Sequence, residues 1–214
     1  MIAIDGPAGA GKSTVGRALA ERLGLRYLDT GAMYRAMTFA AQRRGIAEGD
    51  LGGVAAIVGE VTIDLDPDTG TVHVDGIDAT VHIRSREVTE AVSQISANQA
   101  VRAELVRRQR AWVAERGGAV VEGRDIGSVV FPDAPLKLFV TASPRVRAER
   151  RVAEIGGDVG EVEAAIIERD RRDSTRDHSP LTELDDAVTV DTTGMSIEAV
   201  VDHIVGLLHE RDAR

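Results

Sequence analysis

MIAIDGPAGAGKS, residues 1–13, joins a short apolar run to a glycine-rich segment. The apolar run predicts a buried strand, and apolar side chains then recur at helical spacing from Val15 to Leu23. The segment between them, residues 6–13, satisfies the phosphate-binding pattern G-x-x-x-x-G-K-[ST] in full. Its glycines let backbone N–H groups turn towards a polyphosphate, and the N-terminus of the next helix adds a favourable dipole. The start of the chain therefore predicts a strand, a polyphosphate-binding loop and a helix.

Short apolar runs alternate with helical patterns along the rest of the chain, which is typical of a parallel sheet covered by helices. The expected strands are residues 1–5, 25–29, 119–122, 136–141 and 188–191. Beyond the first helix, the expected helices are residues 30–44, 84–116 with an interruption near Asn98, 145–152 after the Ser143-Pro144 start signal, 162–172 and 197–208. The predicted fold class is α/β, a P-loop NTPase-type five-stranded parallel sheet flanked by helices.

Residues 61–81 change to a twofold pattern with turn signals at Pro67–Gly70 and Asp75-Gly76. We therefore expect a small antiparallel β insertion there. A glycine-rich break at Ile155–Gly160 separates two arginine-bearing helical pieces and indicates a hinged flap. The expected organisation is one domain over residues 1–214, with a core of 1–60 and 117–214, an insertion region of about 61–115 and a flap of about 145–176.

The composition excludes several classes of protein. The 214 residues contain 26 Lys and Arg against 35 Asp and Glu, and only 3% are aromatic, which argues against a nucleic-acid binder. No apolar run approaches the roughly 18 residues of a membrane span, and no basic segment precedes an apolar one as in a secretory signal. There are no cysteines for disulfides, thiolate metal sites or thiol nucleophiles. We expect a cytoplasmic protein without membrane or nucleic-acid partners.

A phosphate-binding loop alone leaves a GTPase, an ATPase motor and a kinase open. Loose D-x-x-G matches occur at residues 50–53 and 191–194, but the guanine-specifying N-K-x-D is missing and the chain is small for a motor. A small-molecule kinase is therefore favoured. In such a site Lys12 reaches the β and γ phosphates and the Ser13 hydroxyl binds Mg²⁺.

Two further segments follow expected strands, at the sheet edge where ligands of open α/β sheets bind. They are DTGAMYR, residues 29–35, and GRDIG, residues 123–127. Arg124 and Asp125 also fit a loop salt bridge, and the dense arginines of residues 169–176 also fit a solvated helix face. Arg145 and Arg147 are expected to be surface residues.

These motifs, together with VRAELVRRQR, EGRDIGSVVFPDA and ERDRRDSTR, resemble bacterial cytidylate kinases, a family of nucleoside monophosphate kinases. The resemblance runs from Ile2 to about Leu208. It implies ATP- and Mg²⁺-dependent phosphorylation of CMP and dCMP by a monomer. It also implies that the inserted sheet belongs to the monophosphate-binding region and that the arginine-rich flap is the lid.

The resemblance assigns roles by motif position. The ATP-binding residues are Gly6, Pro7, Ala8, Gly9, Ala10, Gly11, Lys12, Ser13 and Thr14. Cytosine recognition falls to Ser93, Arg102 and Asp125, and the ribose lies near Arg169 and Asp173. The monophosphate is held by Arg35, Arg124 and Arg176, with the Thr30 hydroxyl beside it. The catalytic set comprises Lys12, Arg124, Arg176 and the lid residues Arg150 and Arg151, which reach the ATP phosphates.

The physics of this assignment leaves other readings open. The Asp125 carboxylate can accept a hydrogen bond from the exocyclic amine of cytosine, which uracil lacks. A P-loop kinase for UMP or for a small hydroxyl compound is the nearest alternative, and a nucleotide-binding regulator without transfer activity is another. Glu122 stands near the expected Mg²⁺ water shell where some relatives have Asp, and its role stays open.

Overall fold

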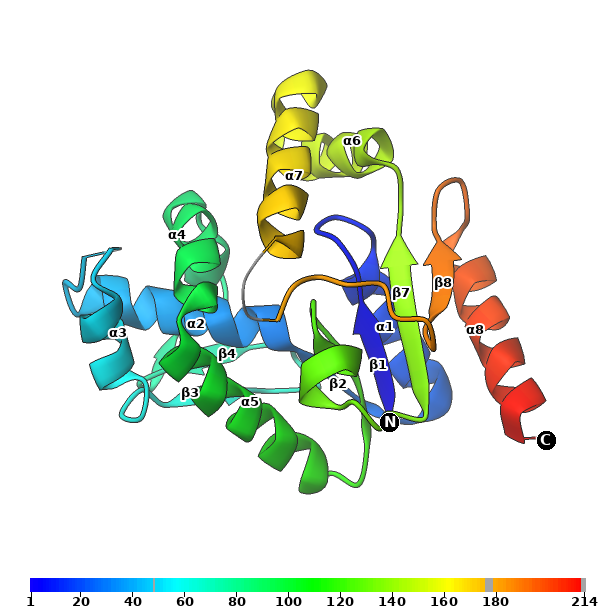
Figure 1. Cartoon of the computed structure of the whole chain (residues 1–214), viewed down its shortest axis with the longest axis horizontal. Helices are drawn as coiled ribbons and strands as arrows, with labels where there is room; N and C mark the ends of the chain where they lie inside the picture. The colour runs from blue at the N-terminus through cyan, green and yellow to red at the C-terminus, as the bar shows by residue number, and fades with distance from the viewer. Residues whose placement is uncertain (48, 176–178, 213–214) are drawn as a thin grey trace. The chain divides into compact units, whose positions relative to one another are not determined.

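The computed structural model describes residues 1–47, 49–175 and 179–212 (Figure 1). The chain forms two compact units, one of residues Met1–Tyr27 with Gly118–Arg214 and one of residues Leu28–Gly117. Each unit has its own sheet and its own buried side chains.

The first unit is built on a five-stranded sheet of order β2-β6-β1-β7-β8. Its strands are β1 (Ile2–Asp5), β2 (Arg26–Asp29), β6 (Ala119–Glu122), β7 (Leu136–Thr141) and β8 (Val188–Asp191). β1 is central and pairs in parallel with β6, where Ile4 is opposite Glu122, and with β7, where Asp5 is opposite Phe139. β7 pairs in parallel with β8. The predicted five-stranded parallel sheet is confirmed, and the carboxyl ends of its strands share one edge.

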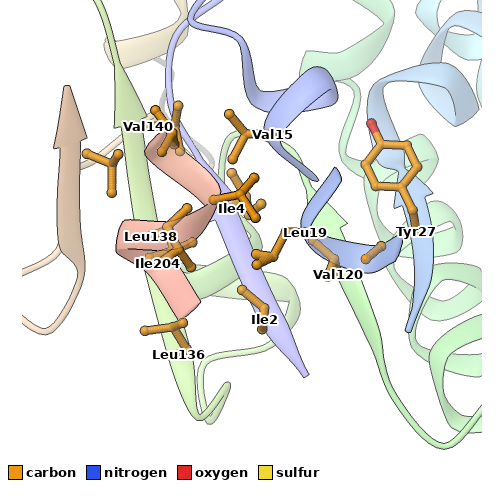
Figure 2. Close-up of a cluster of buried hydrophobic side chains, with 14 of the residues drawn as sticks. Ile2, Ile4, Val15, Leu19, Tyr27, Val120, Leu136, Leu138, Val140 and Ile204 are labelled. Carbon is orange, nitrogen blue, oxygen red and sulfur yellow. The ribbon is translucent and has the colours of Figure 1, made fainter. Parts of the chain in front are cut away.

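Two helices of this unit, α1 (Lys12–Leu23) and α8 (Ile197–Asp212), bury apolar stripes against the sheet. The unit also contains α6 (Pro144–Ile155), α7 (Val159–Ser174) and a π-helical turn at Ile126–Val130. Figure 2 shows Leu19 of α1 and Ile204 of α8 packed with Ile4, Leu138 and Val140 of the strands. Each such buried side chain contributes about 2 kcal/mol by leaving water. This packing fixes β1 and α1, and with them the loop that joins them.

α6 and α7 lie side by side and form the helical pair expected of the lid (Figure 1). Ser143 caps α6 by accepting from Val146 N, and Pro144 occupies the first turn as predicted. Asp158 caps α7 by accepting from Glu161 N at 3.0 Å. Both helices extend beyond the predicted ranges, so the break between them is only Gly156–Asp158.

The second unit carries the predicted antiparallel insertion. Strands β3 (Ile63–Leu65), β4 (Val72–Val74) and β5 (Ile77–Asp78) pair antiparallel in sequence order. Its helices are α2 (Thr30–Arg43), α3 (Leu51–Ile57), α4 (Arg86–Ala97) and α5 (Gln99–Ala114), with a 3-10 turn at His82–Arg84. Asn98 separates α4 from α5 as predicted, because its side chain caps α5 by accepting from Ala100 N and Val101 N.

In the part of the chain that the structure describes, no helix has both the length and the apolarity needed to cross a bilayer.

Candidate functional site

The loop of residues 6–11 runs from β1 into α1, and two of its glycines occupy positions where a side chain would not fit. Gly6 has a φ of 145°, and a Cβ there would lie 2.0 Å from the backbone oxygen of Val140. Gly9 has a φ of 75°, and a Cβ there would lie 3.3 Å from the Cβ of Arg147. Close packing and a positive φ thus explain why glycine stands at residues 6 and 9.

The carbonyl groups of this loop are held from outside it. Arg124 Nη1 donates to Gly6 O at 2.9 Å, and Lys12 Nζ donates to Pro7 O at 2.7 Å. Arg147 Nη1 donates to Ala8 O at 3.0 Å, and Thr192 Oγ1 donates to Ala10 O at 3.1 Å. In a planar trans peptide the N–H of the next residue points opposite to the carbonyl. The N–H groups of Ala8, Gly9 and Gly11 therefore point away from these donors, which is the arrangement of an anion-binding nest.

Lys12 is the first residue of α1, directly after this loop, and its side chain is buried. Burial lowers the pKa of its ammonium group, and the nearby Arg124 lowers it further. Glu122 and Asp5 oppose that shift, while Arg169 adds to it. A site so rich in cations favours an anionic ligand, whose charge would keep Lys12 protonated.

Ser13 and Glu122 meet beside the start of α1. The Ser13 hydroxyl donates to Glu122 Oε1 at 2.7 Å, although 109 residues separate them. Hydroxyl and carboxylate oxygens are the hard donors that Mg²⁺ takes, usually with waters and phosphates completing its shell. The residues present therefore fit a Mg²⁺ site, with Glu122 in contact with the predicted ligand.

Asp5 was not predicted as a site residue, and it fixes the segment after β6. Its carboxylate accepts from Ile126 N at 2.8 Å and Gly127 N at 2.7 Å. Burial and, less strongly, the nearby Asp125 raise the pKa of Asp5 to about 6, although these two hydrogen bonds lower it. A carboxylate ending an otherwise apolar strand was the sequence signal that could have revealed it.

Arg124 and Asp173 are brought together, as their common assignment to a nucleotide site requires. Arg124 Nε donates to Asp173 Oδ2 at 3.0 Å, and the Asp173 side chain is only 6% exposed. The same guanidinium donates to Gly6 O, so it joins α7 to the loop. Asp125, on the following position, is also buried.

The arginines of α6 divide into three kinds. Arg150 donates to the hydroxyl and the carbonyl of Thr192, at 3.0 and 2.9 Å. Arg151 pairs with Glu154 at 3.1 Å on the surface. Arg145 is exposed and pairs with Glu149. The expectation that Arg147 lies on the surface is wrong, because this side chain is only 4% exposed. Helical spacing alone does not show which carbonyl groups a guanidinium will meet.

Four of the predicted nucleotide-site residues belong to the second unit. Arg35 donates to Thr89 Oγ1 at 2.8 Å and to Ile83 O at 3.3 Å. Arg102 is buried, donates to Ser96 O at 3.3 Å and lies 5.7 Å from the Tyr34 ring centroid. Thr30 is buried at the start of α2, and Ser93 is half-buried on α4. Arg176 lies outside the described residues.

The two D-x-x-G matches prove to be local turns. Asp50 caps α3 by accepting from Gly53 N at 2.8 Å, and Asp191 accepts from Thr193 N at 2.8 Å. Neither is a nucleotide switch motif in this fold.

A parallel sheet whose central strand leads through a glycine loop into a helix, with a lysine at the start of that helix, defines a P-loop nucleotide-binding fold. Two solved structures resemble the chain over its whole length. One is the shikimate kinase from Acinetobacter baumannii in complex with shikimate, with a TM-score of 0.50, 15% identity and 94% of that chain covered. The other is an uncharacterized protein from Eubacterium ventriosum ATCC 27560, with a TM-score of 0.53, 13% identity and 98% covered. At these identities the likeness shows the fold alone.

The sequence profile of the cytidylate kinase family matches residues 2–210, and the chain belongs to this family. It is 46% identical over 217 residues to the cytidylate kinase of Streptomyces avermitilis, with 94% of that protein covered. It is 50% identical over 223 residues to the bifunctional pantoate ligase/cytidylate kinase of Synechococcus sp. (strain WH7803). The chain spans 45% of that bifunctional relative, about half its length.

Proposed function

We propose that the protein transfers the γ-phosphoryl group of ATP to CMP or dCMP, giving ADP and CDP or dCDP. The observation that carries the proposal is Arg124, which donates to the phosphate-binding loop at Gly6 O and pairs with the buried Asp173 of α7. One guanidinium thus connects the loop suited to a donor polyphosphate with the segment assigned to the acceptor. Family membership supplies the cytidine nucleotide as acceptor.

The acceptor needs no general base. A phosphate monoester has a second pKa near 6, so its oxygen is already largely ionised at neutral pH. That oxygen attacks the γ phosphorus in line, and the bond from the γ phosphorus to the β–γ bridging oxygen breaks to release ADP. Catalysis then consists of positioning and charge neutralisation by Lys12 and the arginines.

We assign the donor to residues 6–14, with Lys12 on the β and γ phosphates. The proposed acceptor residues are Thr30, Arg35, Ser93, Arg102, Arg124, Asp125, Arg169, Asp173 and Arg176. Among these, Asp125 accepts from the cytosine amine, and uracil would leave its carboxylate unpaired. Arg150 and Arg151 reach the donor phosphates when the lid of residues 145–176 closes and excludes water.

Mg²⁺ would be held through Ser13, with Glu122 accepting from its water shell. When bound, the ion neutralises charge on the β and γ phosphate oxygens. We expect the enzyme to act as a cytoplasmic monomer.

An acceptor panel tests the proposal. ADP release with ATP and Mg²⁺ is followed in parallel with CMP, dCMP, UMP, AMP, GMP and no acceptor. High rates confined to CMP and dCMP are expected. A preference for UMP would support the alternative kinase. Tight ATP binding without acceptor-dependent ADP would instead support the regulator, and equal ADP release without an acceptor would contradict every acceptor-site assignment.

A further inference from the structure

Arg147 is buried and has no role in the proposed chemistry. Its side chain contacts three segments of the chain. Its Nε donates to Ala142 O at 2.9 Å, directly after β7. Its Nη1 donates to Ala8 O at 3.0 Å, inside the phosphate-binding loop. The same Nη1 pairs with Asp170 Oδ2 of α7 at 2.7 Å. A planar guanidinium held at three points is fixed in orientation as well as in place.

The contact with Ala8 sets the direction of one peptide in the loop. Because Ala8 O accepts from Arg147, the N–H of Gly9 points away from Arg147. Gly9 also packs directly on the arginine stem, since a Cβ there would lie 3.3 Å from Arg147 Cβ and 3.7 Å from its Cγ. Two independent contacts therefore hold the same peptide.

Asp170 adds a second connection between α7 and the loop. Asp173, one turn later, reaches Gly6 O through Arg124, and Asp170 reaches Ala8 O through Arg147. Arg124 and Asp173 are both proposed acceptor residues. The connection through Arg147 and Asp170 uses no proposed substrate residue, so it can be tested apart from acceptor binding.

We propose that Arg147 is a positioning residue for the donor nucleotide, which holds the Ala8–Gly9 peptide so that Gly9 N–H faces the donor phosphates. Asp170 acts through Arg147 by fixing its guanidinium. The inference rests on the proposed function in one respect, that the ligand of the loop is ATP. Losing one preorganised hydrogen bond from a backbone amide to a charged phosphate raises the dissociation constant about tenfold.

The test is calorimetric titration of ATP with Mg²⁺, without acceptor, into the wild type and three variants of the full chain. Arg147→Met keeps the apolar stem and removes the donors, and we expect its Kd for ATP to rise about tenfold. Asp170→Asn keeps Arg147 but weakens the contact that fixes its guanidinium, and we expect the Kd for ATP to rise about fivefold. Arg145→Met is the matched control, because Arg145 is exposed on the same helix, and its Kd should stay within twofold.

A separate titration of CMP distinguishes positioning from general damage. We expect the CMP affinity of both Arg147→Met and Asp170→Asn to stay within twofold of wild type. ATP affinity unchanged within twofold in folded variants, or equal losses of ATP and CMP affinity, would overturn the proposal. If Arg147→Met does not fold, Asp170→Asn decides alone. A wild type that binds no ATP would instead overturn the proposed function.

Discussion

Asp125 carries the choice between cytosine and uracil in this account. Asp125→Asn replaces an acceptor by an amide that can donate to the uracil oxygen, so discrimination against UMP should weaken. We expect kcat/KM for CMP to fall by about two orders of magnitude and that for UMP to fall much less. Steady-state kinetics with both acceptors measures this. The exposed Asp133→Asn serves as control, and an unchanged CMP to UMP ratio in Asp125→Asn would remove Asp125 from the base site.

Asp5 should give the free energy of unfolding a distinct pH dependence. Burial raises the native pKa of Asp5 from 3.8 to about 6, so the native state binds this proton more tightly than the unfolded chain does. Protonated Asp5 therefore makes its full contribution to the free energy of unfolding below about pH 4, and this contribution is lost as the pH rises through about 6. Relative to Asp5→Asn, the wild type should lose about 3 kcal/mol across this window. Urea unfolding at several pH values measures the difference, and parallel curves for the two proteins would contradict it.

Single residues differ in how far the sequence reveals them. The place of Lys12 and Ser13 at the start of α1 was predictable because a local motif fixes it, while their roles stay predictions. Arg147 was mispredicted, because its partners Ala8 and Asp170 lie 139 and 23 residues away in the chain and lend it no local pattern. Asp5 was overlooked for the same reason, since its partners follow β6.

The turn from β1 into α1 depends on the missing side chain of Gly6. A Cβ at this position would overlap the backbone oxygen of Val140. Val140 belongs to β7, which is paired on both sides in the sheet and cannot move away. We expect Gly6→Ala to lower the free energy of unfolding by more than about 4 kcal/mol. Gly24 also has a positive φ, of 63°, but a Cβ there would meet open space. Gly24→Ala should therefore cost about 1 kcal/mol. Thermal unfolding followed by circular dichroism compares the two, and equal losses would refute the steric argument.

Arg108 fastens α5 to the segment before β3. Its Nη1 donates to Val61 O at 2.6 Å and its Nη2 to Val58 O at 2.8 Å. Arg108→Met should therefore lower the free energy of unfolding by about 2 kcal/mol. The neighbouring Arg107, which is exposed and pairs with Glu104, provides the control, and Arg107→Met should change it by less than about 0.5 kcal/mol. Chemical denaturation measures both, and equal effects would contradict the role of the two carbonyl contacts.

Elements with a strong period were the predictable ones. The apolar strands and the long helices α5 and α8 follow from such patterns. The short helix α3 was not predicted, because its sequence LGGVAAI contains two glycines and too few turns for a helical period. The π-helical turn at Ile126–Val130 has no sequence signal either, since Asp5 holds its first two amides from another strand.

At the scale of the whole molecule, the strand alternation predicted a parallel sheet but not its order. The central place of β1 between β6 and β7 depends on contacts between segments more than 110 residues apart, such as Ile2 opposite Val120. The division into core, insertion and lid stays a prediction, while the contacts define one unit of Leu28–Gly117 and one of the remaining chain. The family was predictable because several of its motifs lie on separate elements of both units.

Transfer of the ATP γ-phosphoryl group to CMP is the central claim. It is tested most directly by incubating the protein with CMP, Mg²⁺ and ATP carrying radioactive phosphorus at the γ position, and separating the products. The account predicts label in the β-phosphate of CDP, one CDP for each ADP formed. Label released as inorganic phosphate, with no labelled CDP, would contradict it.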